Sequence, residues 1–158
     1  MEKTYNIVEL FSGIGSQAAA LKNLGVKINT VGTSEWDVHA IVAYDMIHGG
    51  TDIPADIARM SKDELLEKMS HYTFSNSGKA PLEYEALRTY SVESLRYIYT
   101  SIRRNHNFVD ISALEGKEMP DGIDILTYSF PCQDLSNVGA FHGLSLIHIS
   151  EPTRPERI

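Results

Sequence analysis

The chain has 158 residues, with 14 Lys and Arg against 21 Asp and Glu, so its formal net charge is −7. Charged residues make up 22% and hydrophobic residues 42% of the sequence, which is typical of one globular domain rather than a disordered or fibrous chain. The single cysteine excludes an intrachain disulfide and a multi-cysteine zinc site, and the acidic balance argues against a self-sufficient nucleic-acid-binding domain.

The first fifty residues predict a strand, a helix, a second strand and a second helix. The segment 6–11 is short and rich in apolar and β-branched residues, as in a buried strand, and it runs into a glycine-containing turn. The alanine-rich residues 16–24 favour a helix, and Gly25 follows where a left-handed cap is expected. Residues 26–31 predict the second strand and residues 37–48 the second helix. This order is typical of an α/β protein with a parallel sheet.

Residues 51–107 have a different, helical character. Residues 61–64 have the form of a capping box at the start of a short helix, and residues 75–81 are rich in turn formers. Residues 91–104 predict a longer helix with an apolar stripe. We therefore expect a helical insertion in the α/β domain.

The sheet is expected to resume in the last third of the chain. Residues 108–111 predict a third strand, and residues 123–128 predict a fourth that ends in a polar loop containing Cys132. A chain ending soon after that strand would leave its outer edge unpaired and its apolar faces poorly covered. We therefore expect poor solubility and no turnover from these residues alone.

No segment predicts a membrane or metal site. No apolar run approaches the roughly 18 to 20 residues that cross a bilayer, and the first five residues lack a secretion signal. The six histidines have no metal-ligand spacing, so we expect them at the surface or in loops. The sequence predicts a cytoplasmic protein.

A glycine motif follows the first predicted strand. Residues 13–18 fit the form G-x-G-x-x-G/A, in which the backbone passes close to a ligand at a helix N-terminus. Glu35 lies 20 residues after Gly15, at the end of the second predicted strand, which suits a carboxylate bonded to ribose hydroxyls. Trp36 follows it, and its indole belongs either over an adenine ring or in the core. The pattern predicts an adenosine-type cofactor and leaves NAD and S-adenosylmethionine open.

Cys132 is the candidate nucleophile. A lone cysteine is commonly an inert, buried, small hydrophobic residue. Cys132, however, follows a proline in a polar loop at the carboxyl end of the predicted sheet, which is where ligands bind in open α/β folds. A thiolate in that position could act in covalent catalysis.

Four ordered segments together resemble the DNA cytosine-5 methyltransferases: VELFSGIG at 8–15, SEWD at 34–37, VDI at 109–111 and FPCQ at 130–133. The resemblance covers residues 5 to about 143, with the insertion at about 51–107 unmatched. It implies a doubly wound, mostly parallel, Rossmann-like S-adenosylmethionine-dependent methyltransferase fold, which would be incomplete here.

The resemblance implies a role for each matched position. The residues expected to bind S-adenosylmethionine are Phe11, Gly13, Ile14, Gly15, Glu35, Trp36, Asp110 and Ile111. Glu35 would bond the ribose and Trp36 would lie against the adenine. Asp110 would bond the adenine amino group, and Ile111 would pack on the ring.

The implied reaction is methyl transfer from S-adenosylmethionine to C5 of cytosine in DNA, in a bacterial or phage modification system that could include a cognate restriction endonuclease. Cys132 would add to C6 and so make C5 nucleophilic. The cytosine would be flipped out of double-stranded DNA. The residues expected to contact it are Pro131, Gln133 and Ser136.

Two other functions use the same residues. A nicotinamide-dependent oxidoreductase would use the glycine turn and Glu35, and a non-catalytic remnant would bind a nucleoside cofactor or nothing. A separate basic feature is a set of four arginines interleaved with four tyrosines: Arg88, Arg96, Arg103 and Arg104 with Tyr84, Tyr90, Tyr97 and Tyr99. They could form a nucleic-acid face, but an amphipathic helix with a solvated basic side is the preferred interpretation.

The sequence also departs from the family pattern. The family's Glu-Asn-Val and arginine motifs, its target-recognition domain and its closing helix are not present, so residues 1–143 are expected to be the N-terminal part of the catalytic domain. Residues 144–158 alternate like an edge strand, but they also resemble translated sequencing-adapter sequence. We expect them to be a non-native tail.

Overall fold

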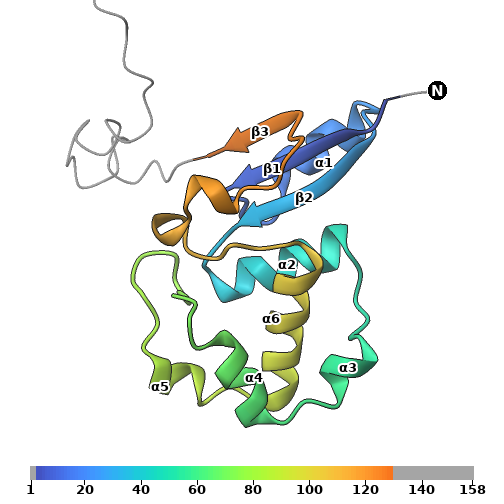
Figure 1. The fold of residues 1–158 in the computed structure, drawn as a ribbon. Coiled ribbons are helices and arrows are strands. Elements are labelled where there is room, and N and C mark those ends of the chain that lie inside the picture. Colours follow the sequence, from blue (N-terminus) through green and yellow to red (C-terminus); the bar gives the residue numbers. More distant parts are fainter. Residues whose placement is uncertain (1–2, 130–158) are drawn as a thin grey trace, which may run out of the picture.

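Three parallel strands form an open sheet in the computed structural model, which describes residues 3–129. The strands are β1 (Tyr5–Leu10), β2 (Ile28–Ser34) and β3 (Ile125–Tyr128), in the order β2-β1-β3. The register of β1 on β2 shifts by one residue between Ile7 and Val8. Figure 1 shows this small sheet above a larger layer of helices.

Two helices follow the first two strands and lie on the same face of the sheet. They are α1 (Ser16–Asn23) and α2 (Val38–His48). Both contact the buried carboxylate of Glu9 on β1: the backbone N–H of Ala18 in α1 donates to Oε1 at 3.0 Å, and the hydroxyl of Tyr44 in α2 donates to Oε2. Asp37 begins α2 as its N-cap and accepts from the N–H groups of His39 and Ala40.

The predicted insertion is helical. It contains the helices α3 (Ala55–Ala58), α4 (Lys62–Met69), α5 (Tyr84–Leu87) and α6 (Val92–Arg104). The predicted capping box is confirmed, because the Ser61 hydroxyl accepts from Glu64 N–H and the Glu64 carboxylate accepts from Ser61 N–H. Ser91 caps α6 by accepting from Ser94 N–H at 3.0 Å.

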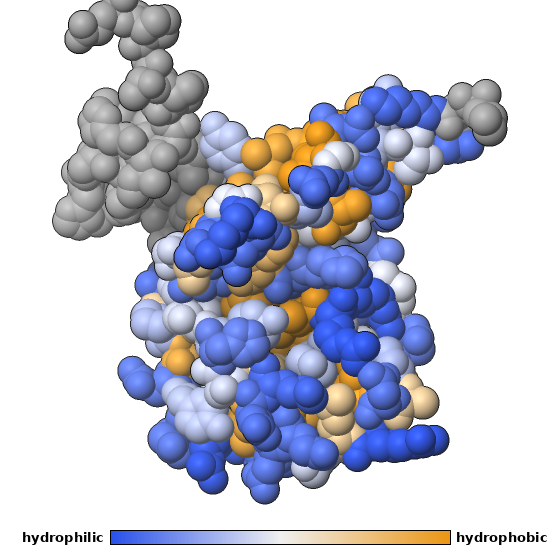
Figure 2. All heavy atoms as spheres, viewed as in Figure 1, coloured by the Kyte–Doolittle hydropathy of each residue, from blue (hydrophilic) through white to orange (hydrophobic). Residues whose placement is uncertain are grey.

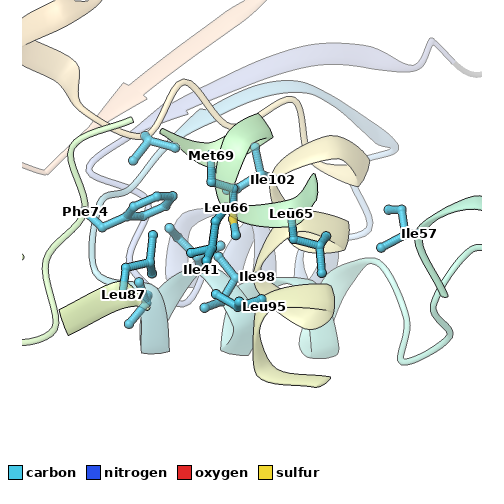
Figure 3. Close-up of a cluster of buried hydrophobic side chains, with 12 residues drawn as sticks. Ile41, Ile57, Leu65, Leu66, Met69, Phe74, Leu87, Leu95, Ile98 and Ile102 are labelled. Atoms are coloured by element: carbon cyan, nitrogen blue, oxygen red, sulfur yellow. The ribbon is translucent and has the colours of Figure 1, made fainter. Parts of the chain in front are cut away.

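The main apolar core lies within the helical layer (Figure 3). Leu95, Ile98 and Ile102 form the predicted stripe of α6, and each is at most 3% exposed. They pack with residues of α2, α3, α4 and α5 and with two loop residues, Phe74 and Val109; the helical ones are Val38, Ile41, Ile57, Leu65, Leu66, Met69 and Leu87. Burial of this stripe against α2 joins the insertion to the α/β part.

The predicted strand at 108–111 is wrong. The chain approaches the outer edge of β2 at one isolated bridge, between Thr33 and Asn107, and Phe108 N–H donates to Thr33 O at 2.9 Å. It then turns away, because Val109 has a φ of +64° and a short 3-10 helix, Ile111–Ala113, follows. The other predicted strands and helices form, with ends displaced by up to three residues.

The second face of the sheet is exposed at β3. Leu126 and Tyr128 point to the face opposite Glu9, because they pair with Val8 and Leu10. They are 50% and 54% exposed, and Figure 2 shows hydrophobic surface over the strands. Within residues 3–129, β3 pairs with β1 alone. The fold is therefore an open parallel sheet with helices, as expected for an incomplete Rossmann-like methyltransferase fold.

Candidate functional site

A pocket of about 430 Å³ lies where β1 and β2 end. Its size falls in the usual range for small-molecule sites, roughly 300 to 1,000 Å³. Five of its described lining residues are polar, and the full set is Phe11, Ser34, Glu35, Trp36, Gly78, Val109, Asp110, Ile111, Ser112 and Ser129. Five of the eight predicted cofactor residues are in this set: Phe11, Glu35, Trp36, Asp110 and Ile111. A larger hollow of about 1050 Å³ lies between α4 and α6, and no predicted site residue lines it.

Glu35 links the glycine turn to the start of α2. Its Oε2 accepts from Gly13 N–H at 2.9 Å, and its Oε1 accepts from Asp37 N–H at 2.8 Å. Asn107 holds its backbone from the other side, donating to Glu35 O and accepting from Glu35 N–H, each at 3.1 Å. The carboxylate is thus fixed at the pocket wall before any ligand arrives. A ribose contact remains a prediction.

The two glycines of the turn have different neighbours. Both have left-handed φ angles, +52° for Gly13 and +82° for Gly15. A Cβ on Gly13 would have no described atom within 4 Å, whereas a Cβ on Gly15 would lie 2.3 Å from His48 Nε2 and 2.7 Å from Tyr44. Gly15 therefore permits close packing of α2. Gly13, Ile14 and Gly15 are not among the described residues that line the pocket, and Gly13 is joined to it through its bond to Glu35.

Glu9 supports the start of α1 beside the glycine turn, a role that sequence reasoning missed. It is fully buried, and its bond to Ala18 N–H supplies an acceptor at the start of α1, where the N-cap Gly15 has no side chain to do so. Burial and the hydrogen bond to Glu9 together raise the pKa of Tyr44 well above its usual range. A carboxylate inside an otherwise apolar strand, directly before a glycine turn, was the available signal.

His48 also contacts the turn, from its partly exposed place at the end of α2. It is the last residue of α2, and its ring centroid lies 4.6 Å from that of Tyr44. Its Nδ1 lies 3.2 Å from Lys22 Nζ and its Nε2 lies 3.1 Å from Ile14 O. Because an ammonium can only donate, Nδ1 accepts and Nε2–H donates to Ile14 O. Lys22 and His48 thereby hold the outer side of the turn.

Two of the three described non-glycine residues with positive φ lie at the pocket wall, and the third is His106. Phe11 and Val109 both have positive φ, +53° and +64°, which is rare for residues with side chains and especially for β-branched ones. Val109 is held there because its N–H donates to Asn107 Oδ1 at 2.8 Å and its carbonyl accepts from the Ser34 hydroxyl at 3.1 Å. The turn places Asp110 and Ile111 at the pocket instead of continuing a strand.

Trp36 and Asp110 line the pocket and also make contacts that stabilise the fold. Trp36 lines the pocket and also packs, half-buried, against the helical core, so the two alternatives weighed for it are combined. Asp110 accepts from Ser112 N–H at 2.9 Å and caps the short 3-10 helix. Pro131, Cys132, Gln133 and Ser136 lie outside the described residues. Ser129, three positions before Cys132, lines the pocket.

The arginines of α6 bind neighbouring parts of the chain. Arg96 donates to Met60 O at 2.9 Å, and Arg103 pairs with Asp56. Arg104 pairs with the buried carboxylate of Asp45 at 2.8 Å. These bonds support the amphipathic-helix interpretation over a nucleic-acid face.

Residues 3–129 contain neither a metal cluster nor a membrane-spanning helix. In that range no three His, Cys, Asp or Glu side chains come together in an arrangement that could hold a metal ion. Nor is any helix in that range both long and apolar enough to cross a bilayer.

Comparison with known proteins gives matches along most of the chain. The model of the family described as C-5 cytosine-specific DNA methylase matches residues 5–75 and 88–147. The orphan methyltransferase M.SssI of Spiroplasma monobiae is 34% identical over 146 residues, and the type II methyltransferase M2.ScrFI of Lactococcus lactis subsp. cremoris is 30% identical over 143 residues. These alignments cover 90% and 87% of this chain, but each covers 38% of the relative. The orphan methyltransferase M.SPBetaI of Bacillus phage SPbeta is 41% identical over 61 residues, which are 37% of this chain and 14% of that protein.

The family match corrects one expectation about the insertion. Residues 51–107 were expected to lie outside the resemblance, but the match includes all of them except 76–87. The chain spans about 38% of the length of the first two relatives.

Proposed function

Because the chain belongs to the C-5 cytosine-specific DNA methylase family, we propose that its pocket binds S-adenosylmethionine and that the whole protein methylates C5 of cytosine in DNA. The observation that carries the cofactor proposal is the set of five predicted residues lining one pocket: Phe11, Glu35, Trp36, Asp110 and Ile111. They come from segments up to 100 positions apart in the sequence. The pocket combines an indole, a phenyl ring and two carboxylates, which suits a nucleoside.

The charges around the turn favour S-adenosylmethionine over NAD. A pyrophosphate needs free backbone N–H groups at the glycine turn and helix N-terminus. Here Glu35 accepts from Gly13 N–H and Glu9 accepts from Ala18 N–H, so two carboxylates occupy donors that a pyrophosphate would need. The described pocket lining contains no Lys or Arg. This anionic surrounding opposes a pyrophosphate and is compatible with a cationic sulfonium.

Cys132 is proposed as the nucleophile. Cys132 follows Ser129, which lines the pocket, by three positions in the sequence, and three residues span at most about 11 Å of extended chain. The Cys132 thiolate adds to C6 of a flipped-out cytosine, and the displaced ring electron pair makes C5 nucleophilic. S-adenosylmethionine supplies the methyl group, carried on a sulfonium sulfur, that C5 takes up. Loss of the C5 proton to a base then expels the Cys132 thiolate and restores the ring.

Double-stranded DNA is the proposed substrate, although the chain carries a net charge of −7. Phosphate contacts need clustered Lys and Arg, and the α6 arginines are paired within the chain. We place the phosphate-binding surface in the further length that the relatives have. The relative M2.ScrFI is named a type II methyltransferase and M.SssI an orphan one, so a cognate restriction endonuclease remains a prediction. The protein would act in the bacterial cytoplasm, whether a bacterium or a phage encodes it.

The cofactor proposal is tested by titrating the 158-residue chain with S-adenosylmethionine and NAD in a calorimeter. We expect binding of the former alone. Glu35→Gln should weaken it, because an amide cannot accept from both Gly13 N–H and Asp37 N–H without repulsion. The matched control Glu93→Gln, on the exposed start of α6, should bind as the unsubstituted chain does. Binding of NAD without S-adenosylmethionine would contradict the proposal.

The catalytic proposal needs a chain of the relatives' length. Residues 1–143 can be joined to the remaining length of the Spiroplasma relative and incubated with DNA containing 5-fluorocytosine. The fluorine cannot leave as a proton does, so a covalent complex should accumulate, and Cys132→Ser should abolish it. A complex that persists in the serine variant would rule out Cys132 as the nucleophile. The 158-residue chain alone should give no methyl transfer.

A further inference from the structure

The 75–81 loop of the insertion is joined directly to the segment that carries Trp36. Ser75 N–H donates to Trp36 O at 2.8 Å, and Val38 N–H donates to Ser75 O at 2.9 Å. These bonds form a parallel bridge between Asp37 and Ser75. In Figure 1 the light-green loop before α5 rises from the helical layer toward the end of the sheet where the strands terminate. Most of this loop falls in residues 76–87, which the family model does not match.

The Ser75 side chain closes the loop on itself. Ser75 is fully buried, and its hydroxyl donates to Ala80 O at 2.7 Å. The same oxygen accepts from Ser77 N–H at 3.2 Å and from Gly78 N–H at 2.9 Å. On either side, Phe74 is buried in the helical core and its carbonyl accepts from Leu82 N–H at 2.7 Å. The conformation of the loop is therefore specified both by the bond that joins its two ends and by the bonds of the Ser75 hydroxyl within it.

Gly78, at the tip of the loop, lines the same pocket as Glu35 and Trp36. Its φ is +68°, and a Cβ built on it would have Asp37 Oδ2 as its nearest described neighbour, at 3.9 Å. Since it has no side chain, Gly78 presents bare backbone to the pocket. A larger residue there would have room to extend toward that space.

We propose that the 75–81 loop is a wall of the cofactor pocket that contacts the nucleoside half of S-adenosylmethionine. The inference rests on the proposed function and adds to it a loop that lies mostly outside the family match. The loop adjoins the pocket on the side of Trp36, where the adenosine is expected, and Ser75 acts as a positioning residue for Gly78. Residues 76–81, which the family model does not match, thereby help to form the cofactor site.

Two variants test the loop. Ser75→Ala removes the hydroxyl that orders it, and loss of these bonds should raise the dissociation constant for S-adenosylmethionine about tenfold. Gly78→Asn keeps a residue that tolerates positive φ but adds a side chain at the wall, and it should weaken binding by a similar factor. Binding is measured by calorimetry on the 158-residue chain, and the melting temperature is measured without ligand.

Two matched controls separate the loop from general effects. Gly122→Asn makes the same substitution at a φ of +72°, with no described atom within 4 Å of its Cβ, and Gly122 O contacts Asn6 at the opposite end of β1. Ser70→Ala removes an exposed hydroxyl that donates to Glu67 O. Both should bind S-adenosylmethionine as the unsubstituted chain does.

A second ligand locates the contact. The nucleoside 5′-methylthioadenosine lacks the amino-acid part, so both loop variants should weaken it by the same factor as S-adenosylmethionine. Unchanged affinity in both loop variants, or weakening confined to S-adenosylmethionine, would overturn the inference while leaving the proposed cofactor intact. If the unsubstituted chain bound no S-adenosylmethionine, the cofactor proposal would fail, and the loop inference would fail with it. Weakening in Gly122→Asn equal to that in Gly78→Asn would also overturn it.

Discussion

The helical layer and the sheet differ in the kind of side chain that they bury. The helical layer buries an uninterrupted apolar cluster between α2, α4 and α6. The sheet instead buries a carboxylate, Glu9, on its helical face, and on the other face it exposes Leu126 and Tyr128. Apolar burial is the larger source of stability, whereas buried polar groups specify geometry. The comparison indicates that the helical layer carries most of the folding energy and that the sheet edge carries the site.

The strongest test of this difference replaces one leucine in each region. Leu95→Ala removes a fully buried side chain of α6 and should cost about 3 kcal/mol of unfolding free energy, through lost burial and a cavity. Leu126→Ala, at a residue 50% exposed on β3, should cost about 0.5 kcal/mol or less. Urea unfolding of both variants measures the difference. Equal losses would mean that the sheet contributes as much as the helices.

The glycine turn is where the two regions meet, and its two glycines should respond differently. Gly15→Ala should destabilise the fold by about 2 to 4 kcal/mol, because φ is +82° and the new methyl group would collide with His48 and Tyr44 of α2. Gly13→Ala should cost about 1 kcal/mol from backbone strain alone. Thermal unfolding measures both. A larger loss for Gly13→Ala would contradict the packing of α2 on Gly15.

Arg104 and Arg103 allow a buried ion pair to be compared with an exposed one on the same helix. Arg104→Met should cost about 2 kcal/mol, because Asp45, whose side chain is 6% exposed, loses its partner. Arg103→Met should cost about 0.5 kcal/mol or less, because its pair with Asp56 is exposed. In a chain of the relatives' length, both substitutions should leave the affinity for DNA unchanged, which filter binding can check. A marked fall in DNA affinity for Arg103→Met would revive the nucleic-acid face.

The loss of unfolding free energy in Arg104→Met should also depend on pH. Burial raises the pKa of Asp45 above its ordinary value, with Asn105 and Arg104 opposing that rise. A carboxyl group with a raised pKa in the folded state stabilises the fold below its unfolded pKa and loses that contribution as pH rises through the folded pKa. Without Arg104 the pKa of Asp45 should rise further. The loss in Arg104→Met should therefore be larger at neutral pH than in acid.

The smallest expected effect is at the amino-terminal end of the sheet. Asp124 accepts from Lys3 Nζ at 2.7 Å and from Asn6 N–H at 3.0 Å, and these bonds hold its pKa below the ordinary value. A lowered pKa adds stability above the unfolded pKa that is lost as pH falls through the folded one. Asp124→Asn should flatten the acid limb of the stability curve below about pH 4. An unchanged limb would show that the Lys3 and Asn6 bonds add nothing to stability.

Much of the fold could be predicted because it rests on local patterns. Apolar alternation, alanine content, caps and glycine stops placed three strands and the helices of residues 16–24, 37–48 and 91–104 to within three residues. The strand predicted at 108–111 failed because its β-branched composition was outweighed by contacts that sequence does not display. Asn107 and Ser34 hold Val109 at positive φ, and the chain leaves the edge of β2 after one bridge.

The candidate site was predictable where a motif marks it. The resemblance identified Phe11, Glu35, Trp36, Asp110 and Ile111, which the structure gathers at one pocket. Glu9 and His48 were missed because a buried carboxylate and a helix-end histidine have no pattern of their own. Their roles arise from contacts with Tyr44 and Ile14, which lie 35 and 34 positions away.

By itself, the sequence determined the order of strands and helices, the glycine turn and the family, because backbone propensities and short motifs act over a few neighbouring residues. The tertiary structure alone decided that Gly15 packs against α2 while a Cβ on Gly13 would meet no described atom, and that Asn107 holds Glu35 across 72 positions. It also brought the 75–81 loop to the pocket. These contacts form only when distant segments pack together, since each partner meets its hydrogen-bonding and steric requirements in a residue far along the chain.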